Sequence, residues 1–347
     1  MRLGRFAFLA VGAMLSGSAA EAAKTPAEFS SLQSTVDWIN AYRVERPAAL
    51  APLAIRALSF HGAFKEPEAA GVYVGFIAGL IGTHPENADL LIRKMLPVRE
   101  EDQWAIVRGI AYSGHPRWKK LLRQFAPQLP NRAVMVGQYL DGTLPVLDEL
   151  SIKPSTTTFQ RVREALTVEW FDSGKKKKKP ELEPTQTLLD TLWGYYLASG
   201  SYAPVMRMVE LLPWSKDKDN VDRLTVGSMA KYTLAMNAAR DANLLATLKY
   251  VRRQQGKETA AILDEIVQAA DTADTGRLRK DALAAIEQLK MKGPAYKREM
   301  STWGKVGQGA LAVGCVAAAA TGHIELGLPC VIGGGATNAA AYYINDR

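Results

Sequence analysis

Apolar residues recur along most of this chain with the spacing of an amphipathic helix. From Glu28 onward they return every three or four residues, in segments of about 10 to 18 residues. Proline, glycine, aspartate or asparagine interrupts these segments, for example at 45–47, 62–67 and 83–85. The alternating, β-branched pattern of strands is nearly absent. The pattern predicts an all-α fold.

Two segments share one helix–turn–helix pattern. Residues 104–116 end in Ser-Gly-His-Pro, and residues 193–204 end in Ser-Gly-Ser-Tyr-Ala-Pro. Glycine favours a helix end and proline the first turn of the next helix, so each segment predicts a hairpin. Each second helix is predicted to run to a proline, Pro127 or Pro213. Hairpins of this kind stack into an α-solenoid, and the alternative is an irregular helical bundle.

The first 23 residues have the pattern of a secretory signal. Arg2 and Arg5 precede an apolar run, and small residues offer cleavage sites after Ala20 or Ala23. The apolar run, residues 6–15, is shorter than the ~20 residues that a membrane-spanning helix needs. We therefore expect an exported bacterial protein, periplasmic or extracellular.

Composition changes divide the rest of the chain. A polar, charged and proline-containing segment in the middle predicts an exposed linker between two helical regions. The expected units are a signal peptide (1–23), an N-terminal helical region (24–150), a linker with a helix and a lysine-rich loop (151–183), a second helical region (184–292) and a C-terminal hairpin (293–347).

The C-terminal hairpin is rich in alanine and glycine. Small residues recur there at four-residue steps, which places them on one helix face: Ala310, Gly314, Ala318 and Gly322. Such a face permits close helix packing, so we expect either a tightly packed cap on the helical domain or an element that contacts a membrane. Cys315 and Cys330 are the two cysteines. In an oxidising compartment they are expected to form a disulfide, the alternative being two buried thiols.

A second glycine stripe lies near the N-terminus. Gly71, Gly75 and Gly79 recur at four-residue steps within an uncharged apolar stretch. This stretch predicts a buried core helix. Tryptophans at helical spacing from aliphatic neighbours, such as Trp104 and Trp193, are likewise predicted to pack in the core or between hairpins.

The net charge of +8 is concentrated in one run. Five of the charges belong to consecutive lysines, Lys175, Lys176, Lys177, Lys178 and Lys179. Without residues 1–23 and this run, 36 basic and 34 acidic residues nearly cancel. The composition therefore predicts one local basic tract and not a basic surface. We expect a solvated loop there, or a contact with an anionic surface such as lipid headgroups. Export argues against nucleic acid as a partner.

Signatures of catalysis and of bound cofactors are missing from the sequence. It contains no nucleophile elbow, no phosphate-binding loop and no His-Glu-x-x-His motif. The four histidines are scattered, and three adjoin proline or glycine, which predicts turn residues and not metal ligands. We expect no cofactor and no metal. Glu169, next to two aromatic residues, is the residue to test for the alternative of an enzyme acting on envelope glycan.

One segment resembles a known group of proteins. Residues 189–205 combine Leu-Trp, an aromatic residue, Ser-Gly and Pro-Val in a spacing similar to that of an uncharacterised family of bacterial α-helical proteins. The resemblance implies a helical fold and carries no activity with it. We therefore expect a helical binding or scaffolding module without catalytic activity, with a protein or peptide partner in the cell envelope. The alternative is a membrane-associated protein anchored by its C-terminal hairpin.

Overall fold

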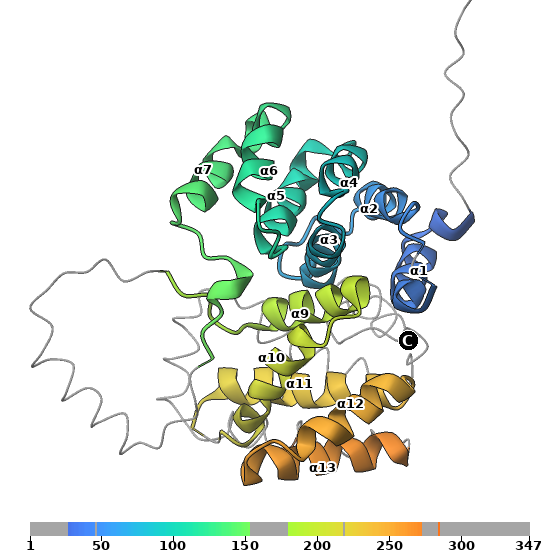
Figure 1. The fold of residues 1–347 in the computed structure, drawn as a ribbon, viewed down its shortest axis with the longest axis vertical. Coiled ribbons are helices and arrows are strands. Elements are labelled where there is room, and N and C mark those ends of the chain that lie inside the picture. Colours follow the sequence, from blue (N-terminus) through green and yellow to red (C-terminus); the bar gives the residue numbers. More distant parts are fainter. Residues whose placement is uncertain (1–26, 46, 153–179, 218, 273–283, 285–347) are drawn as a thin grey trace, which may run out of the picture.

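A computed structural model describes residues 27–45, 47–152, 180–217, 219–272 and 284 (Figure 1). Within these residues the regular elements are helices, joined by turns and by one isolated parallel bridge between Leu150 and Leu182. The all-α prediction is confirmed.

Helical hairpins packed side by side form the N-terminal part. Within it, α3 packs against α5, and α2 packs against α4. The helices described there are α1 (Leu32–Glu45), α2 (Ala51–Phe60), α3 (Gly71–Thr83), α4 (Ala88–Met95), α5 (Gln103–Tyr112), α6 (Trp118–Phe125) and α7 (Ala133–Asp141). Short 3-10 turns join several of them. Neighbouring hairpins of the N-terminal part thus lie next to one another.

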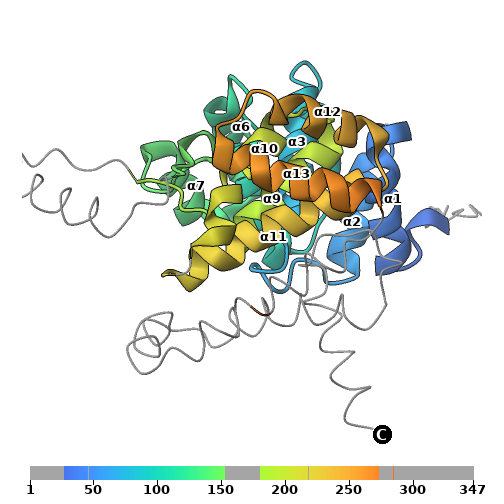
Figure 2. The ribbon, with the colours of Figure 1, turned by 90° about the horizontal axis from the view of Figure 1, so that it is seen from below.

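Further helices make up the second part, below the first in Figure 1. Those that the structure describes are α9 (Gln186–Ser199), α10 (Ala203–Glu210), α11 (Val221–Ala238), α12 (Ala242–Arg252) and α13 (Lys257–Asp271). α9 packs with α10, and α11 packs with both α12 and α13. Seen from below in Figure 2, α12 and α13 lie in front of α9 and α3. α9 is therefore the layer between the N-terminal hairpins and the helices α11 to α13.

The two predicted hairpin turns are present. Gly114 and Gly200 each have φ of 65°, the left-handed conformation that glycine adopts without strain after a helix. The second helices end earlier than predicted, at Phe125 and Glu210. After each of these helices the backbone continues as a short 3-10 helix. The proline lies near the start of that 3-10 helix, where its missing N–H costs no hydrogen bond.

The backbones of α3 and α9 are in direct contact. A Cβ on Gly75 would overlap the carbonyl oxygen of Thr191, and a Cβ on Gly194 would overlap that of Val72. Gly71 and Gly79 face α9 in the same way. Because glycine has no side chain, the two helices can approach this closely. The glycine stripe is therefore the seam of a buried core helix, as predicted.

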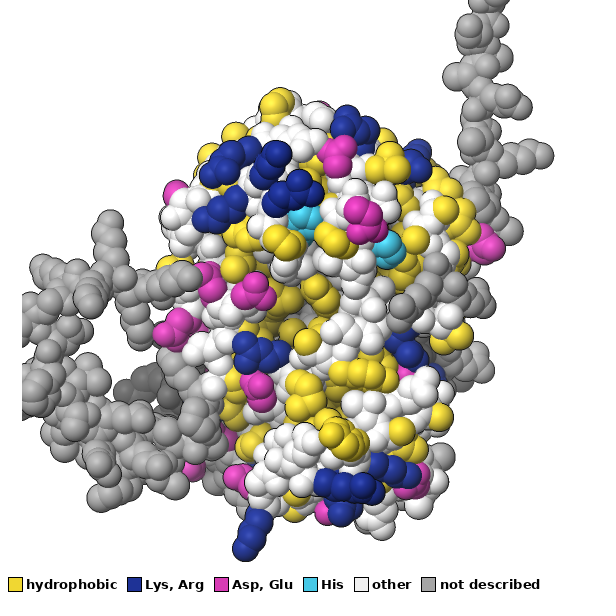
Figure 3. Space-filling model, in the orientation of Figure 1, with side chains coloured by type: hydrophobic (Ala, Val, Ile, Leu, Met, Phe, Trp, Pro, Cys, Tyr) yellow, Lys and Arg dark blue, Asp and Glu magenta, His cyan; other side chains and the backbone are white. Residues whose placement is uncertain are grey.

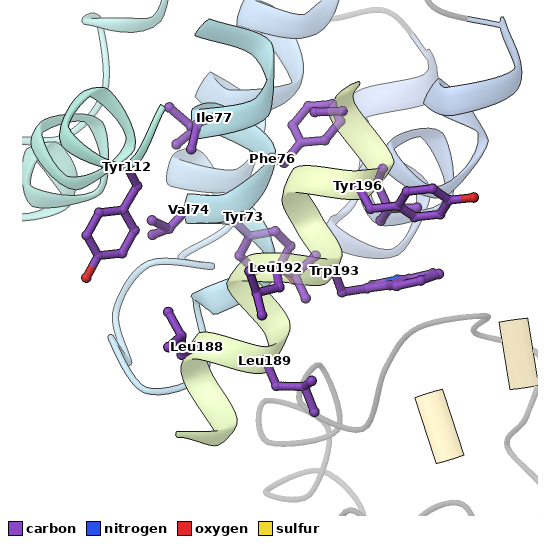
Figure 4. Close-up of a cluster of buried hydrophobic side chains, with 14 of the residues drawn as sticks. Tyr73, Val74, Phe76, Ile77, Tyr112, Leu188, Leu189, Leu192, Trp193 and Tyr196 are labelled. Atoms are coloured by element: carbon purple, nitrogen blue, oxygen red, sulfur yellow. The ribbon is translucent and has the colours of Figure 1, made fainter. Parts of the chain in front are cut away.

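One hydrophobic core runs through both parts. Figure 4 shows side chains leaving α3 on two sides, Val74 and Ile77 toward Tyr112 of α5, and Tyr73 and Phe76 toward α9. Trp104 and Trp193, which are predicted to pack in the core, belong to the same cluster, and so does the buried Trp214. The described regions on either side of the predicted linker thus share their core.

Polar side chains join neighbouring helices at two places on the edge of this core. Ser59 Oγ donates to Asp102 Oδ2 at 2.6 Å, and the backbone N–H of Arg99 donates to Ser59 Oγ at 3.1 Å, which ties α2 to the start of α5. At the other place, Arg43 and the hydroxyl of Tyr196 both contact Oδ2 of Asp241, the N-cap residue of α12. A buried carboxylate is stable when donors surround it in this way.

Candidate binding surface

The site residues predicted from sequence lie outside the described residues. These are the lysine run Lys175–Lys179, the small-residue face Ala310, Gly314, Ala318 and Gly322, and the pair Cys315 and Cys330. Glu169 and His323 are also outside them. The disulfide, the C-terminal hairpin and the anionic contact of the lysine run therefore remain predictions.

The described residues instead present a basic helix face on α6. Leu121, Leu122 and Phe125 of this helix are buried in the core. The charged residues of the segment are all exposed: Lys119, Lys120 and Arg123 lie on the outer side of α6, and Arg117 is its N-cap residue. We call these four residues the α6 basic face. Figure 3 shows dark blue Lys and Arg side chains gathered over α6, at the upper end of the molecule.

The turn before α6 positions this face. His115 is buried, and its Nδ1 accepts a hydrogen bond of 2.9 Å from the backbone N–H of Arg117. This leaves Nε2 to donate to the carbonyl oxygen of Pro85, 3.1 Å away, in the turn between α3 and α4. The start of α6 is thereby fixed to the preceding hairpin.

Three of the four cations have no carboxylate partner within the described part of the chain. No ion pair joins Arg117, Lys120 or Arg123 to an acidic group there. Lys119 is partly engaged: its Nζ donates to the carbonyl oxygen of Leu140 at 3.2 Å and lies 5.3 Å from the centre of the Trp118 ring. Arg117, Lys120 and Arg123 thus carry positive charge that no ion pair among the described residues neutralises.

Acidic groups near α6 are already engaged. On α4, Asp89 forms an ion pair of 2.9 Å with Arg93 and also accepts a hydrogen bond from Gln124. At the end of α7, hydrogen bonds from Thr143 lower the pKa of Asp141, and the charge of Lys119 lowers it further. Asp141 is fully exposed, so this interaction leaves the charge of the α6 basic face largely uncompensated.

The sequence pattern around α6 indicates this basic surface, although the net charge of the whole chain does not. Residues 103–140 include no aspartate or glutamate but six basic residues: Arg108, Arg117, Lys119, Lys120, Arg123 and Arg132. The prediction of one basic tract and no basic surface is therefore wrong for α6. A sum over the chain balances these cations against acids that lie elsewhere in the fold, whereas surface charge depends on which residues share a face.

The three described histidines occupy turns, as predicted. His61 and His84 end α2 and α3, and His115 lies in the turn before α6. Among the described residues, no three His, Cys, Asp or Glu side chains come together as a metal site would require. None of the helices in the described part of the chain has both the length and the apolar character needed to cross a membrane.

Comparison with known proteins adds no relative. No family model matches the chain. No curated protein and no solved structure matches it either. The resemblance of residues 189–205 to uncharacterised bacterial helical proteins thus remains a prediction, and what this protein does must be argued from its own residues.

Proposed function

We propose that this protein is an exported helical module of the bacterial cell envelope that binds an anionic partner through the α6 basic face. The observation that carries the proposal is the exposure of Lys120 and Arg123 on one side of α6 and of Arg117 at its N-cap, with no carboxylate paired to them among the described residues. Unpaired surface cations attract a negatively charged partner and orient it as it approaches.

The fold supports a binding role for this surface. α6 is held by its buried residues Leu121, Leu122 and Phe125, and its first turn is fixed through His115. The cations therefore project from a rigid scaffold, and ordering the helix costs little when a partner binds. Export is part of the proposal and rests on the pattern of residues 1–23.

A binding assay with washed cell envelopes tests the proposal. The full chain is compared with the variant Arg117→Gln, Lys120→Gln, Arg123→Gln, and with a control that loses three exposed cations elsewhere, Arg56→Gln, Arg253→Gln, Lys257→Gln. The parent and the control should bind the envelopes, and the α6 variant should not. Binding should also be lost near 1 M salt, where the Debye length is about 3 Å.

Equal binding of the two variants would contradict the proposal, because it would show that the position of the cations is irrelevant. Circular dichroism of each variant checks that the helices are retained. Fractionation of the native host tests export separately, since a cytoplasmic location would remove that part of the proposal.

A further inference from the structure

We infer that the partner of the α6 basic face is an anionic bilayer surface, which the protein binds peripherally through lipid headgroups. This inference rests on the proposed function and names the class of its partner. It is argued from the charges on α6 together with the apolar side chains that flank them on α4 and α7.

The cations are arranged to act together on a flat surface. Positions 117 to 123 span about 9 Å of helix rise, which is within one Debye length of about 10 Å at 0.1 M salt. Lys120 and Arg123 are three residues apart and therefore share one side of α6. Each cation close to an anionic leaflet strengthens binding by about fivefold, without needing a partner of fixed shape.

Exposed aliphatic side chains flank the cations on both neighbouring helices. Val134, in the first turn of α7, is 76% exposed, and Leu90 of α4 is 48% exposed. α7 packs against α6, and α4 is joined to it where Gln124 bonds Asp89 and where Arg93 lies 5.8 Å from the centre of the Phe125 ring. In Figure 3, yellow hydrophobic side chains lie beside the dark blue ones at this end of the molecule.

A bilayer interface matches this combination better than an acidic protein does. Phosphate groups bind the cations, while aliphatic side chains enter the boundary between headgroups and acyl chains. Trp118 is half-buried against the core, and the ammonium of Lys119 lies over its ring. A purely polar acidic segment would pair with the charges but would offer Val134 and Leu90 no apolar contact.

The direct test is sedimentation of the full chain with lipid vesicles. Vesicles of phosphatidylglycerol mixed with phosphatidylcholine are compared with vesicles of phosphatidylcholine alone. We expect binding to the anionic vesicles only, and at least a tenfold weaker partition for Arg117→Gln, Lys120→Gln, Arg123→Gln. The control Arg56→Gln, Arg253→Gln, Lys257→Gln should bind as the parent does.

Three further variants show which part of the chain makes the contact with lipid. Val134→Asn should weaken vesicle binding severalfold with no change in charge, whereas Val44→Asn, at a residue that is 78% exposed on α1, should not. Replacing Lys175–Lys179 by glutamine measures any contribution of that run. If it alone abolishes binding, the inference is overturned.

The outcomes of these experiments distinguish a failure of the bilayer inference from a failure of the proposed function. If the α6 variant binds anionic vesicles like the parent, or if all vesicles bind equally, the bilayer inference is wrong. If envelopes bind through α6 but anionic vesicles do not, the inference fails while the proposed function stands, and an acidic protein becomes the partner.

Discussion

Gly75 of α3 lies against the backbone carbonyl of Thr191 in α9, so closely that the two helices touch main chain to main chain. Thr191 Oγ1 donates a hydrogen bond of 2.8 Å to the carbonyl oxygen of Thr187 on its own helix. This polar side chain is therefore satisfied within the apolar contact between the helices. The contact joins parts of the chain that are far apart in the sequence.

Gly75→Ala should destabilise the protein because a methyl group has no room at this seam. We expect the free energy of unfolding to fall by about 1–3 kcal/mol, measured by urea denaturation. Gly137→Ala is the matched control, since nothing lies within 4 Å of a Cβ at that position. The control should gain up to about 1 kcal/mol from helix propensity. Equal stability of both variants would refute the tight seam.

Ser59→Ala should weaken the hydrogen-bonded contact between α2 and the start of α5. The substitution removes the donor to buried Asp102 and the acceptor for the N–H of Arg99. We expect a loss of about 1–3 kcal/mol in unfolding free energy. Ser201→Ala serves as control, because this exposed hydroxyl only accepts one long bond of 3.3 Å from Ala203. Its effect should stay within about 0.5 kcal/mol.

His115 should exist as the tautomer protonated at Nε2. Its Nδ1 accepts from Arg117 and its Nε2 faces the carbonyl oxygen of Pro85, so the opposite tautomer would lose both hydrogen bonds. Nitrogen NMR of the histidine side chains distinguishes the two forms. A signal from the Nδ1–H form would contradict this geometry. His115→Ala should also cost about 1–3 kcal/mol in unfolding free energy.

Stability should decline in alkaline solution. Burial raises the pKa of Tyr73, Tyr112 and Tyr196 well above the usual value. The unfolded chain releases these protons from about pH 10, while the folded chain retains them. Unfolding is therefore favoured as pH rises past about 10, by up to about 1.4 kcal/mol per pH unit for each such tyrosine.

Denaturant unfolding at a series of alkaline pH values measures this decline. Tyr73→Phe should make it shallower, because one tyrosine fewer titrates on unfolding. Near neutral pH the same variant should stay close to the parent. Tyrosinate absorbance from the buried residues should appear together with unfolding, and its appearance in the folded state would contradict the prediction.

Local features of the fold could be predicted from the sequence. The helix stops at Gly114 and Gly200 are local, because only the residue itself must adopt φ of 65°. The buried character of residues 71–81 follows from their lack of charge. The helix that packs against α3 could not be predicted. The glycine stripe indicates that some other helix lies close to this one, but not which helix.

The basic face of α6 was within reach of the sequence. Lys120 and Arg123 fall on the side of α6 away from Leu121 and Leu122, and Arg117 caps the start of the helix, in a stretch free of acidic residues. The side chains that surround this face could not be predicted from the sequence. The neighbouring aspartates Asp89 and Asp141 are engaged by contacts that only the packed structure reveals.

The seam between α3 and α9 also constrains the order of folding. When residues 71–83 leave the ribosome, the helix that covers their glycine face has not yet been made. Long-range contacts of this kind form late and slowly, and until then the apolar surface stays open to aggregation. A chain truncated before residue 186 should therefore be a client of chaperones rather than a stable fragment.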